Sequence, residues 1–396
     1  MSTRTKKQAV VEAAVETSTH PPATPIRVSR DNLAAGMSQV KPVIGRGALY
    51  ALSHVLLEAE GEQLRLTGTN LSIWISAVVP IQGSDAAWKL AVPAHTLDEV
   101  LRVLPPESVL TATLEEGNQM RLTTDRTTTH LKGLPADDFP LMPSLTPAQQ
   151  VALPAAAWNQ CLAQVLPAVA KDDGRPVLTN LNLETDDGGL LLTATDAMRL
   201  ARTRQPLSLT QDVACLLSRQ TAQLLTRVGA KHEGDVLFAL DEAQNQLFTV
   251  GGTVIFAAGS EGSFPNVMPI VDSAMTNVAS TVTLAREPLA QALRLVGVMM
   301  PSSKQMAVQF EDEGSELKLW ANDAEVGDTQ QVMPAQIAGP GLKLVLNGDY
   351  LRDAVAACVG ESVVLRASPS PKAPIICGGD DMDAGYHLIM PMVDHA

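Results

Sequence analysis

The segment Asp380-Asp381-Met382-Asp383 is the cluster in this chain whose residue types could most directly do chemistry. Grouped carboxylate oxygens are the ligands that Mg²⁺ and Ca²⁺ prefer, so the segment raises the hypothesis of a metal-dependent enzyme. Glycines stand on both sides, at Gly378-Gly379 and Gly385, and this composition is more typical of a hairpin turn. Asp137-Asp138 has the same character. We therefore expect turns at both places and keep the metal enzyme as an alternative.

No other arrangement of reactive side chains points to catalysis. None of the seven histidines pairs with another at ligand spacing, and the GxSxG, HExxH and phosphate-loop patterns do not occur. Four cysteines, Cys161, Cys215, Cys358 and Cys377, are widely spaced and include no CxxC pair, which favours reduced structural thiols in a cytoplasmic protein. We expect no catalytic residue, no metal and no cofactor.

A repeated stretch organises the chain around its middle. The stretch 190–200 reads LLLTATDAMRL, a variant stands at 64–70 and a fainter one at 317–323, so successive copies are 126 and 127 residues apart. The pairs Phe139-Pro140 and Phe264-Pro265 are 125 residues apart, in step with these copies. The near-equal spacing indicates three similar domains.

Each copy follows a β-rich run and an acidic turn that contains glycine, at Gly61, Gly188 and Gly314. Glycine tolerates the backbone conformation of a tight turn, so each copy is predicted to be the second strand of a hairpin. We expect an N-terminal tail over 1–25, without the apolar segment of a secretory signal, and domains at 26–148, 149–276 and 277–396.

Each domain is expected to contain two helices among strands, an α+β arrangement with the helices on one face of a sheet. Ser29 is a candidate N-cap for a helix that ends near Pro42. The other predicted elements are helices over 93–104, 154–170, 218–228, 286–300 and 347–359, strands over 50–58, 63–79, 177–185, 190–204 and 386–392, a hairpin over 306–320, and a loop over 264–269.

The charge is divided unevenly between the helices and the rest of the chain. The formal net charge is -14, yet the six predicted helical segments with their flanks carry +6, which leaves -20 for everything else. Basic helices could meet the phosphates of a duplex, and with only 3% aromatic residues we expect backbone contact without sequence specificity. No run approaches the roughly 20 apolar residues needed to span a bilayer, so no membrane association is expected.

Several motifs in this order resemble one known family. Thr193-Ala194-Thr195-Asp196 with Arg199-Leu200, the preceding Arg175-Pro176-Val177-Leu178, the Phe-Pro pairs, and the terminal Met390-Pro391-Met392 are similar to the bacterial DNA polymerase III beta subunit, the sliding clamp family. The resemblance runs from about Ile26 to Met392.

The resemblance implies a DNA clamp fold with three tandem clamp domains per chain. Two chains would form a closed six-domain ring around duplex DNA, with helices inside and sheets outside. Such a homodimer is a processivity factor and not an enzyme. Its implied partners are the DNA polymerase III catalytic subunit, the clamp loader and other proteins that carry a clamp-binding motif.

The resemblance also implies three sets of site residues. A peptide-binding pocket between domains 2 and 3 would comprise Leu178, Thr195, Ala197, Met198, Arg199, Leu200, Pro265, Leu388, Met390, Pro391 and Met392. DNA would be contacted by Arg46, Lys41, Lys171, Arg219 and Arg294. The dimer interface would involve Leu131, Val298 and Met299.

The chain departs from the family pattern at the pocket. Ala197-Met198 stands where the family usually has Gly-His, and the loop over 264–269 is shorter than usual and lacks its aromatic residue. Thr129 occupies an interface position that is often aromatic. These differences indicate a divergent clamp. A clamp-like protein that does not load on DNA and sequesters clamp-binding peptides is the alternative.

Overall fold

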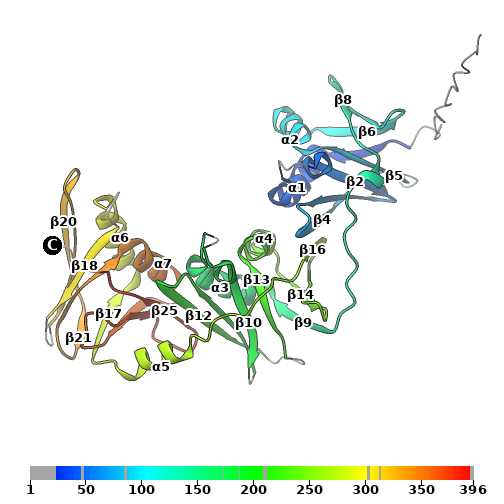
Figure 1. Ribbon diagram of the computed structural model, residues 1–396. Helices are drawn as coiled ribbons and strands as arrows, with labels where there is room; N and C mark the ends of the chain where they lie inside the picture. Colours follow the sequence, from blue (N-terminus) through cyan, green and yellow to red (C-terminus); the bar gives the residue numbers. More distant parts are fainter. Residues whose placement is uncertain are drawn as a thin grey trace, which may run out of the picture. The chain divides into compact units, whose positions relative to one another are not determined.

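The computed structural model describes residues 24–45, 49–83, 87–172, 174–186, 188–207, 212–300, 304–311 and 314–392. Two compact units divide the chain (Figure 1). The first comprises the described residues up to 70 together with 76–141, and the second comprises 71–75 together with the described residues from 142 onward. Each unit is described by itself.

The described residues of the first unit form two α-helices and two groups of four strands. The strands within each group have the orders β5-β2-β3-β4 and β1-β6-β7-β8. In chain order the elements are β1 (Ile26–Ser29), α1 (Arg30–Val40), β2 (His54–Glu60), β3 (Gln63–Thr69), β4 (Ile73–Pro80), β5 (Ala87–Pro93), α2 (Ala94–Val103), β6 (Val109–Glu115), β7 (Gln119–Thr123) and β8 (Thr128–Lys132).

Helix α1 begins where the sequence predicts. The Ser29 side chain accepts a hydrogen bond from the Asp31 backbone N–H at 3.2 Å, which satisfies one of the free donors at the helix start. Leu33, Met37 and Val40 recur at four and three residues and are all buried. This apolar stripe places α1 against the sheet and against α2.

The second unit begins with β9 (Gln149–Pro154), α3 (Ala155–Val165), β10 (Asn180–Asp186), β11 (Gly189–Thr195), β12 (Arg199–Pro206), β13 (Ala214–Ser218), α4 (Arg219–Gly229), β14 (Asp235–Leu240), β15 (Gln246–Val250), β16 (Thr253–Ala257) and α5 (Met268–Thr276). It continues with β17 (Ser280–Ala285), α6 (Arg286–Val298), β18 (Gln305–Phe310), β19 (Glu316–Asp323), β20 (Gly327–Pro334), β21 (Gln336–Ala338), β22 (Leu342–Asn347), α7 (Gly348–Ala357), β23 (Ser362–Ala367), β24 (Ile375–Gly378) and β25 (Gly385–Ile389).

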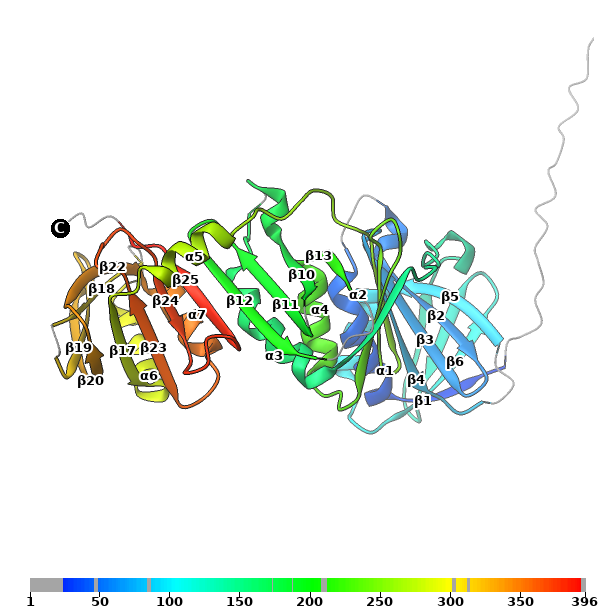
Figure 2. The same cartoon turned by 90° about the horizontal axis from the view of Figure 1, so that it is seen from below.

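One long sheet joins the two halves of the second unit. Its strand order is β13-β10-β11-β12-β25-β24-β23-β17-β21, and Figure 2 shows most of these strands side by side. Strands β12 and β25 pair antiparallel, with Leu200 opposite Leu388, so segments almost 190 residues apart share backbone hydrogen bonds. The strands β16-β15-β14-β9 and β20-β19-β18-β22 form two further groups.

Successive residues of β25 enter different cores because side chains in a strand alternate between faces. Leu388 packs with Leu200, Val271 and Ala274 under α5. Its neighbour Ile389 belongs to the larger core that α6 and α7 cover on the other face. Figure 1 shows α5 on one side of this sheet and α6 and α7 on the other. The joint between the two halves is therefore buried from both sides.

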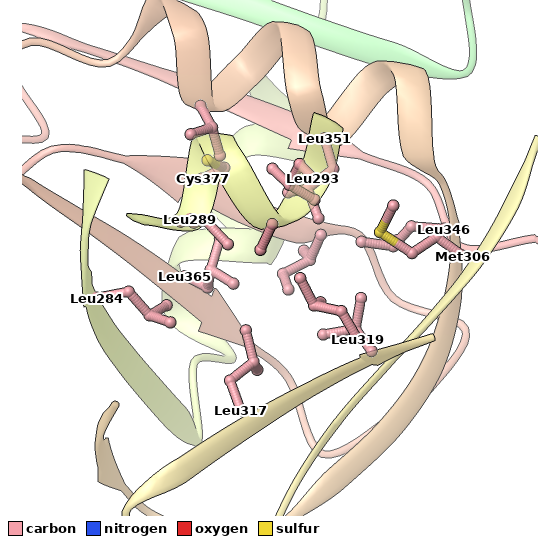
Figure 3. Packing of buried hydrophobic residues seen from close by; sticks show 14 of the residues in the cluster. Leu284, Leu289, Leu293, Met306, Leu317, Leu319, Leu346, Leu351, Leu365 and Cys377 are labelled. Atoms are coloured by element: carbon pink, nitrogen blue, oxygen red, sulfur yellow. The ribbon is translucent and has the colours of Figure 1, made fainter. Parts of the chain in front are cut away.

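The larger core gathers aliphatic side chains from both helices and from the strands around them. Leu289 and Leu293 of α6, Leu351 of α7 and Leu365 of β23 are almost fully buried and meet in the cluster drawn in Figure 3. Side chains of this kind stabilise a fold by roughly 1.5–3 kcal/mol each when removed from water. This core fixes where α7 lies.

The described residues confirm the α+β class and the three predicted hairpins. The pairs β2–β3, β10–β11 and β18–β19 are antiparallel, and each copy of the repeated stretch provides the second strand. A strand also leads into the first helix each time, as β1–α1, β9–α3 and β17–α6, and each such helix packs on a second one.

Several element bounds predicted from the sequence are wrong, including helix ends that lie two to five residues earlier than expected. The predicted strands over 63–79 and 190–204 are each two strands, β3 with β4 and β11 with β12, because apolar residues continue through turns that contain Leu71 and Ala197 in place of glycine. Other strand predictions were too long, since residues 50–53 and 176–179 are 3-10 turns and the final strand ends at Ile389.

The predicted loop over 264–269 is also wrong, because it runs into helix α5 from Met268 onward. Pro269 lies in the first turn of this helix, where its missing N–H has no helical partner to lose. The loop was expected from the family pattern, whereas the proline is compatible with a helix start.

Replacing Leu293 by alanine should lower the free energy of unfolding by about 2–5 kcal/mol, because it opens a cavity in the core of Figure 3. Leu295 lies on the same helix with 51% of its side chain exposed, so Leu295→Ala should change stability by less than about 0.5 kcal/mol. Urea unfolding at two protein concentrations would separate stability from association. Equal losses in the two variants would contradict this assignment of the core.

Candidate functional site

The turn between β11 and β12 holds the centre of the predicted pocket. The Arg199 carbonyl accepts hydrogen bonds from the Asp196 backbone N–H at 3.3 Å and from the Thr195 hydroxyl at 2.7 Å. Asp196 Oδ1 accepts from the backbone N–H groups of Met198 at 3.0 Å and Arg199 at 2.9 Å. The Asp196 side chain thus organises the turn by local hydrogen bonds.

Ala197 occupies this turn with a φ of 74°, a left-handed conformation that costs a residue with a Cβ roughly 1–2 kcal/mol. Its N–H is held by the Thr195 hydroxyl at 3.1 Å. The hydrogen bonds around Asp196 offset the strain. The turn points Met198 outward, with 49% of its side chain exposed.

Arg199 is buried, and each of its three guanidinium nitrogens has a hydrogen-bond partner. Its Nε lies 3.0 Å from Asp196 Oδ2, and one terminal nitrogen lies 2.8 Å from Asp353 Oδ2 on α7. The other donates to the Pro167 carbonyl, and the guanidinium stands 4.2 Å from the centre of the Tyr350 ring. A buried cation needs such partners, so Arg199 ties the β11–β12 turn to helix α7.

A cavity of about 510 Å³ opens beside this turn. This volume lies in the usual range of pockets that bind small molecules. Its lining combines aliphatic side chains with charges of both signs and comprises Val169, Ala170, Lys171, Asp172, Gly174, Arg175, Leu178, Asp196, Ala197, Met198, Arg199 and Tyr350. The cavity can therefore bury apolar groups and also fix polar ones.

The structure brings four of the predicted pocket residues together on this cavity. They are Leu178, Ala197, Met198 and Arg199. Thr195 supports the turn from behind. Met390 donates its backbone N–H to the Met198 carbonyl at 3.0 Å, and Met392 donates to the Val345 carbonyl at 2.8 Å, which fixes the segment after β25.

The other seven predicted pocket residues do not line this cavity, and four of them lie away from the turn and its supporting contacts. Leu200 and Leu388 are buried in the small core under α5. Pro265 is exposed and Pro391 is half-buried. Several lining residues are absent from the predicted pocket set, among them Tyr350 of α7, and Asp353 of the same helix binds Arg199 from outside the lining. The sequence places both on a predicted helix, but only the packing of α7 shows that they meet Arg199.

Most of the cations expected to contact DNA already have partners within the chain. Lys41 Nζ lies 2.5 Å from Asp98, and Arg294 lies 3.2 Å from Glu287, where it holds the pKa of that carboxyl below its usual value. Arg219 donates to the Val169 carbonyl at 2.6 Å. Lys171 is exposed at the cavity, and Arg46 lies outside the described residues.

The three residues predicted for the dimer interface differ in exposure. Val298 is 66% exposed at the end of α6, whereas Met299 is partly buried against the core of Figure 3. Leu131 is only 5% exposed. It belongs to the interior of the first unit because it faces inward from β8, so β8 could join a partner through its backbone edge but not through this side chain.

His387 lies on β25 opposite Ala201 and Cys377 and is almost fully buried. Burial disfavours its charged form and, with the nearby positive charge of Arg199, lowers the pKa of His387 to about 4. The imidazole is therefore neutral at neutral pH. His387 thus adds no charge to the paired strands β12 and β25, where Arg199 is the buried cation.

The carboxylates that first suggested a metal enzyme form a turn. The Asp383 backbone N–H donates to Asp381 Oδ1 at 2.9 Å, between β24 and β25. Among the described residues no group of three or more His, Cys, Asp or Glu side chains is placed to hold a metal ion. None of the helices in the described ranges has the length and apolar run needed to cross a bilayer.

Comparison with known proteins matches the first two thirds of the chain to one family. Residues 24–143 match the N-terminal domain of the DNA polymerase III beta subunit, and residues 152–266 match its central domain. The chain belongs to the DNA polymerase III beta subunit family. The resemblance stated from the sequence is thereby confirmed.

Relatives of this family match along nearly their whole length. The beta sliding clamp of Synechocystis is 25% identical over 388 residues, which covers 92% of this chain and 97% of the relative. The beta sliding clamp of Pseudomonas aeruginosa is also 25% identical, with 92% and 98% covered.

Solved structures show the same fold. A sliding clamp from Pseudomonas aeruginosa, bound to griselimycin, has a TM-score of 0.85 at 23% identity and covers 94% of this chain and 100% of its own. The sliding clamp from Bacillus subtilis has a TM-score of 0.85 at 17% identity, with 94% and 100% covered. The clamp fold is thus common to these chains despite low sequence identity.

The depressed pKa of His387 predicts a loss of stability in mild acid. The unfolded state takes up a proton near pH 6.5 and the folded state only near pH 4, so stability is fully present above 6.5 and falls as the pH drops through this window. Wild type should lose roughly 3 kcal/mol more than His387→Gln between pH 7 and 4.

Urea unfolding at several pH values measures this difference. The exposed His95 provides the control, because His95→Gln should keep the wild-type slope. The assignment would be wrong if His387→Gln and wild type lost stability in parallel.

Proposed function

We propose that this chain is a sliding clamp that acts as a DNA polymerase processivity factor. Two chains would form a closed ring around duplex DNA, slide without sequence specificity and hold the polymerase on its template. No catalytic step is involved. The observation that carries the proposal is the family membership together with near-complete coverage of proteins named beta sliding clamp.

The ring proposal assigns clamp domains to residues 26–148, 149–276 and 277–396. The repeated order of strand, helix and hairpin supports this division. A sheet edge at β8 and the exposed Val298 on α6 are available for contact with a second chain. Closing a ring by two-fold symmetry would cover such edges.

Contact with DNA would rely on cations that can exchange a carboxylate partner within the chain for a DNA phosphate. Arg294 and Glu287 form an exposed ion pair, which contributes at most about 1 kcal/mol, so phosphates could compete for Arg294. The Lys41 side chain is 41% exposed, although its partner Asp98 is only 15% exposed, so Lys41 can also reach a phosphate. Arg219 has the opposite character, because its bond to the Val169 carbonyl supports the wall of the cavity. We therefore assign Lys41, Lys171, Arg294 and Arg46 to DNA and Arg219 to the pocket wall.

We infer that the cavity beside Arg199 receives a short linear peptide from the polymerase, the clamp loader or another partner. Met198 and Leu178 offer flexible apolar contact, and Arg175 and Lys171 offer charge. The crystallised relative bound to griselimycin supports this inference, since it is a clamp of this fold that holds a ligand.

The ring predicts a solution mass near twice 41.9 kDa and retention on circular DNA only. After loading by the cognate clamp loader on nicked circular DNA, the protein should remain through gel filtration and should leave when the DNA is linearised. Val298→Arg should give a mass near 41.9 kDa and lose retention, because it places a charge on the proposed contact surface.

Val103→Arg is the matched control, since Val103 is 85% exposed on α2 and is not among the residues proposed for the interface. It should behave as wild type. Equal retention on circular and linear DNA would contradict topological binding. A wild-type monomer that still binds peptides would favour the peptide-sequestering alternative.

The pocket proposal predicts that Met198→Asp weakens griselimycin binding about tenfold or more. The change puts a carboxylate on the apolar rim, and a tenfold loss corresponds to about 1.4 kcal/mol. Fluorescence or calorimetric titration measures the dissociation constant. Leu237→Asp, a change at a half-exposed position on β14, should leave it unchanged. Unaltered binding by Met198→Asp would place the ligand elsewhere.

A further inference from the structure

Two cysteines meet at the end of helix α7. Cys358 is the residue that caps this helix, and Cys377 lies in β24, with the two sulfur atoms 4.0 Å apart. Cys377 is completely buried in the core drawn in Figure 3, and Cys358 is partly buried against the same core. One thiol of the pair is thus nearer to solvent than the other.

The surroundings make the two thiols chemically unequal. A hydrogen bond with Cys377 and the positive charge of Arg286 lower the pKa of Cys358, although burial opposes them. Arg286 is held beside it by a hydrogen bond from its Nε to the Gly360 carbonyl at 2.8 Å. The pKa of Cys377 is raised by its bond with Cys358 and by burial. Cys358 is therefore the thiol that can ionise first.

A disulfide requires the two sulfur atoms to approach by about 2 Å, to a bond length of roughly 2.05 Å. Cys358 follows the last turn of α7, and its thiol contacts the Ala354 carbonyl at 3.3 Å. Rotation about the Cα–Cβ bond of Cys358 would exchange this contact for one with the Cys377 sulfur.

We propose that Cys358 and Cys377 are an oxidation site that forms a reversible disulfide when the protein meets a peroxide. The Cys358 thiolate attacks one peroxide oxygen, the O–O bond breaks and the thiol becomes a sulfenic acid. The Cys377 sulfur then attacks Sγ of Cys358, the S–O bond breaks and water leaves. The two thiols lose two electrons and two protons in total, and hydrogen peroxide is reduced to two molecules of water.

The bond would join the C-terminal end of α7 to β24. Helix α7 carries Tyr350 and Asp353, which hold Arg199. Strand β24 pairs with β25, and Met390 just after β25 bonds to Met198. Oxidation therefore cross-links elements that support both sides of the cavity. The proposal concerns the thiols of the folded chain and does not depend on the ring.

The test is peroxide treatment of the full chain, followed by alkylation of the remaining thiols, digestion and mass spectrometry. We expect one cross-linked peptide pair, joining Cys358 to Cys377, that dithiothreitol cleaves. The thermal midpoint of the oxidised protein should rise by about 5 °C, because a closed loop restricts the unfolded chain. Cys161 and Cys215 should stay reduced, since burial raises their pKa values to about 11 and about 12.

Variants distinguish oxidation of the Cys358–Cys377 pair from general oxidation of the thiols in the chain. Cys377→Ser leaves Cys358 without a partner, so peroxide should drive it to a sulfinic acid that dithiothreitol does not reverse. Cys358→Ser, at the partly exposed position, should abolish both the cross-link and the thermal shift, and Cys215→Ser should cross-link as wild type does. The proposal is overturned if folded wild type gives no Cys358–Cys377 peptide, or if Cys161 and Cys215 oxidise equally fast.

Discussion

The buried guanidinium of Arg199 is the interaction on which the geometry of the second unit depends. A cation removed from water must be matched by nearby charge and hydrogen-bond acceptors, and Arg199 finds them in three different segments. Asp196 is local, whereas Asp353 and the Pro167 carbonyl arrive through the fold. Because all three are needed at once, the turn, helix α7 and the wall of the cavity have one mutual arrangement.

The two faces of the β12–β25 joint serve different purposes. On one face, Leu200 and Leu388 pack under α5 in a small apolar core. On the other, His387 stays neutral beside Arg199 and below α7. Neighbouring residues of a strand point to opposite faces of the sheet. The apolar core under α5 and the charged wall of the pocket are therefore built on the same pair of strands. This arrangement suits a ligand site that must keep its shape.

Side chains that look alike in the sequence have different roles in the fold. Arg294 forms an exposed ion pair, which is weak and exchangeable, and Lys41 forms a partly buried one, while Arg219 is fixed to a backbone carbonyl. Cys358 and Cys377 meet, although their wide spacing in the sequence favoured reduced structural thiols. In both cases the chemistry follows from the partner and not from the residue type.

The sequence alone determined the repeat, the hairpins, the α+β class and the family, because these rest on local periodicity, turn residues and ordered motifs. It located helix α1 from Ser29 and its apolar stripe, and it named Leu178, Ala197, Met198 and Arg199 for the pocket. Only the tertiary structure separated Leu200 and Leu388 from that cavity, buried Leu131 and brought Tyr350 and Asp353 to Arg199. These outcomes depend on which face of each strand is covered and on contacts more than 150 residues apart, as from Arg199 to Asp353, and no local pattern encodes either.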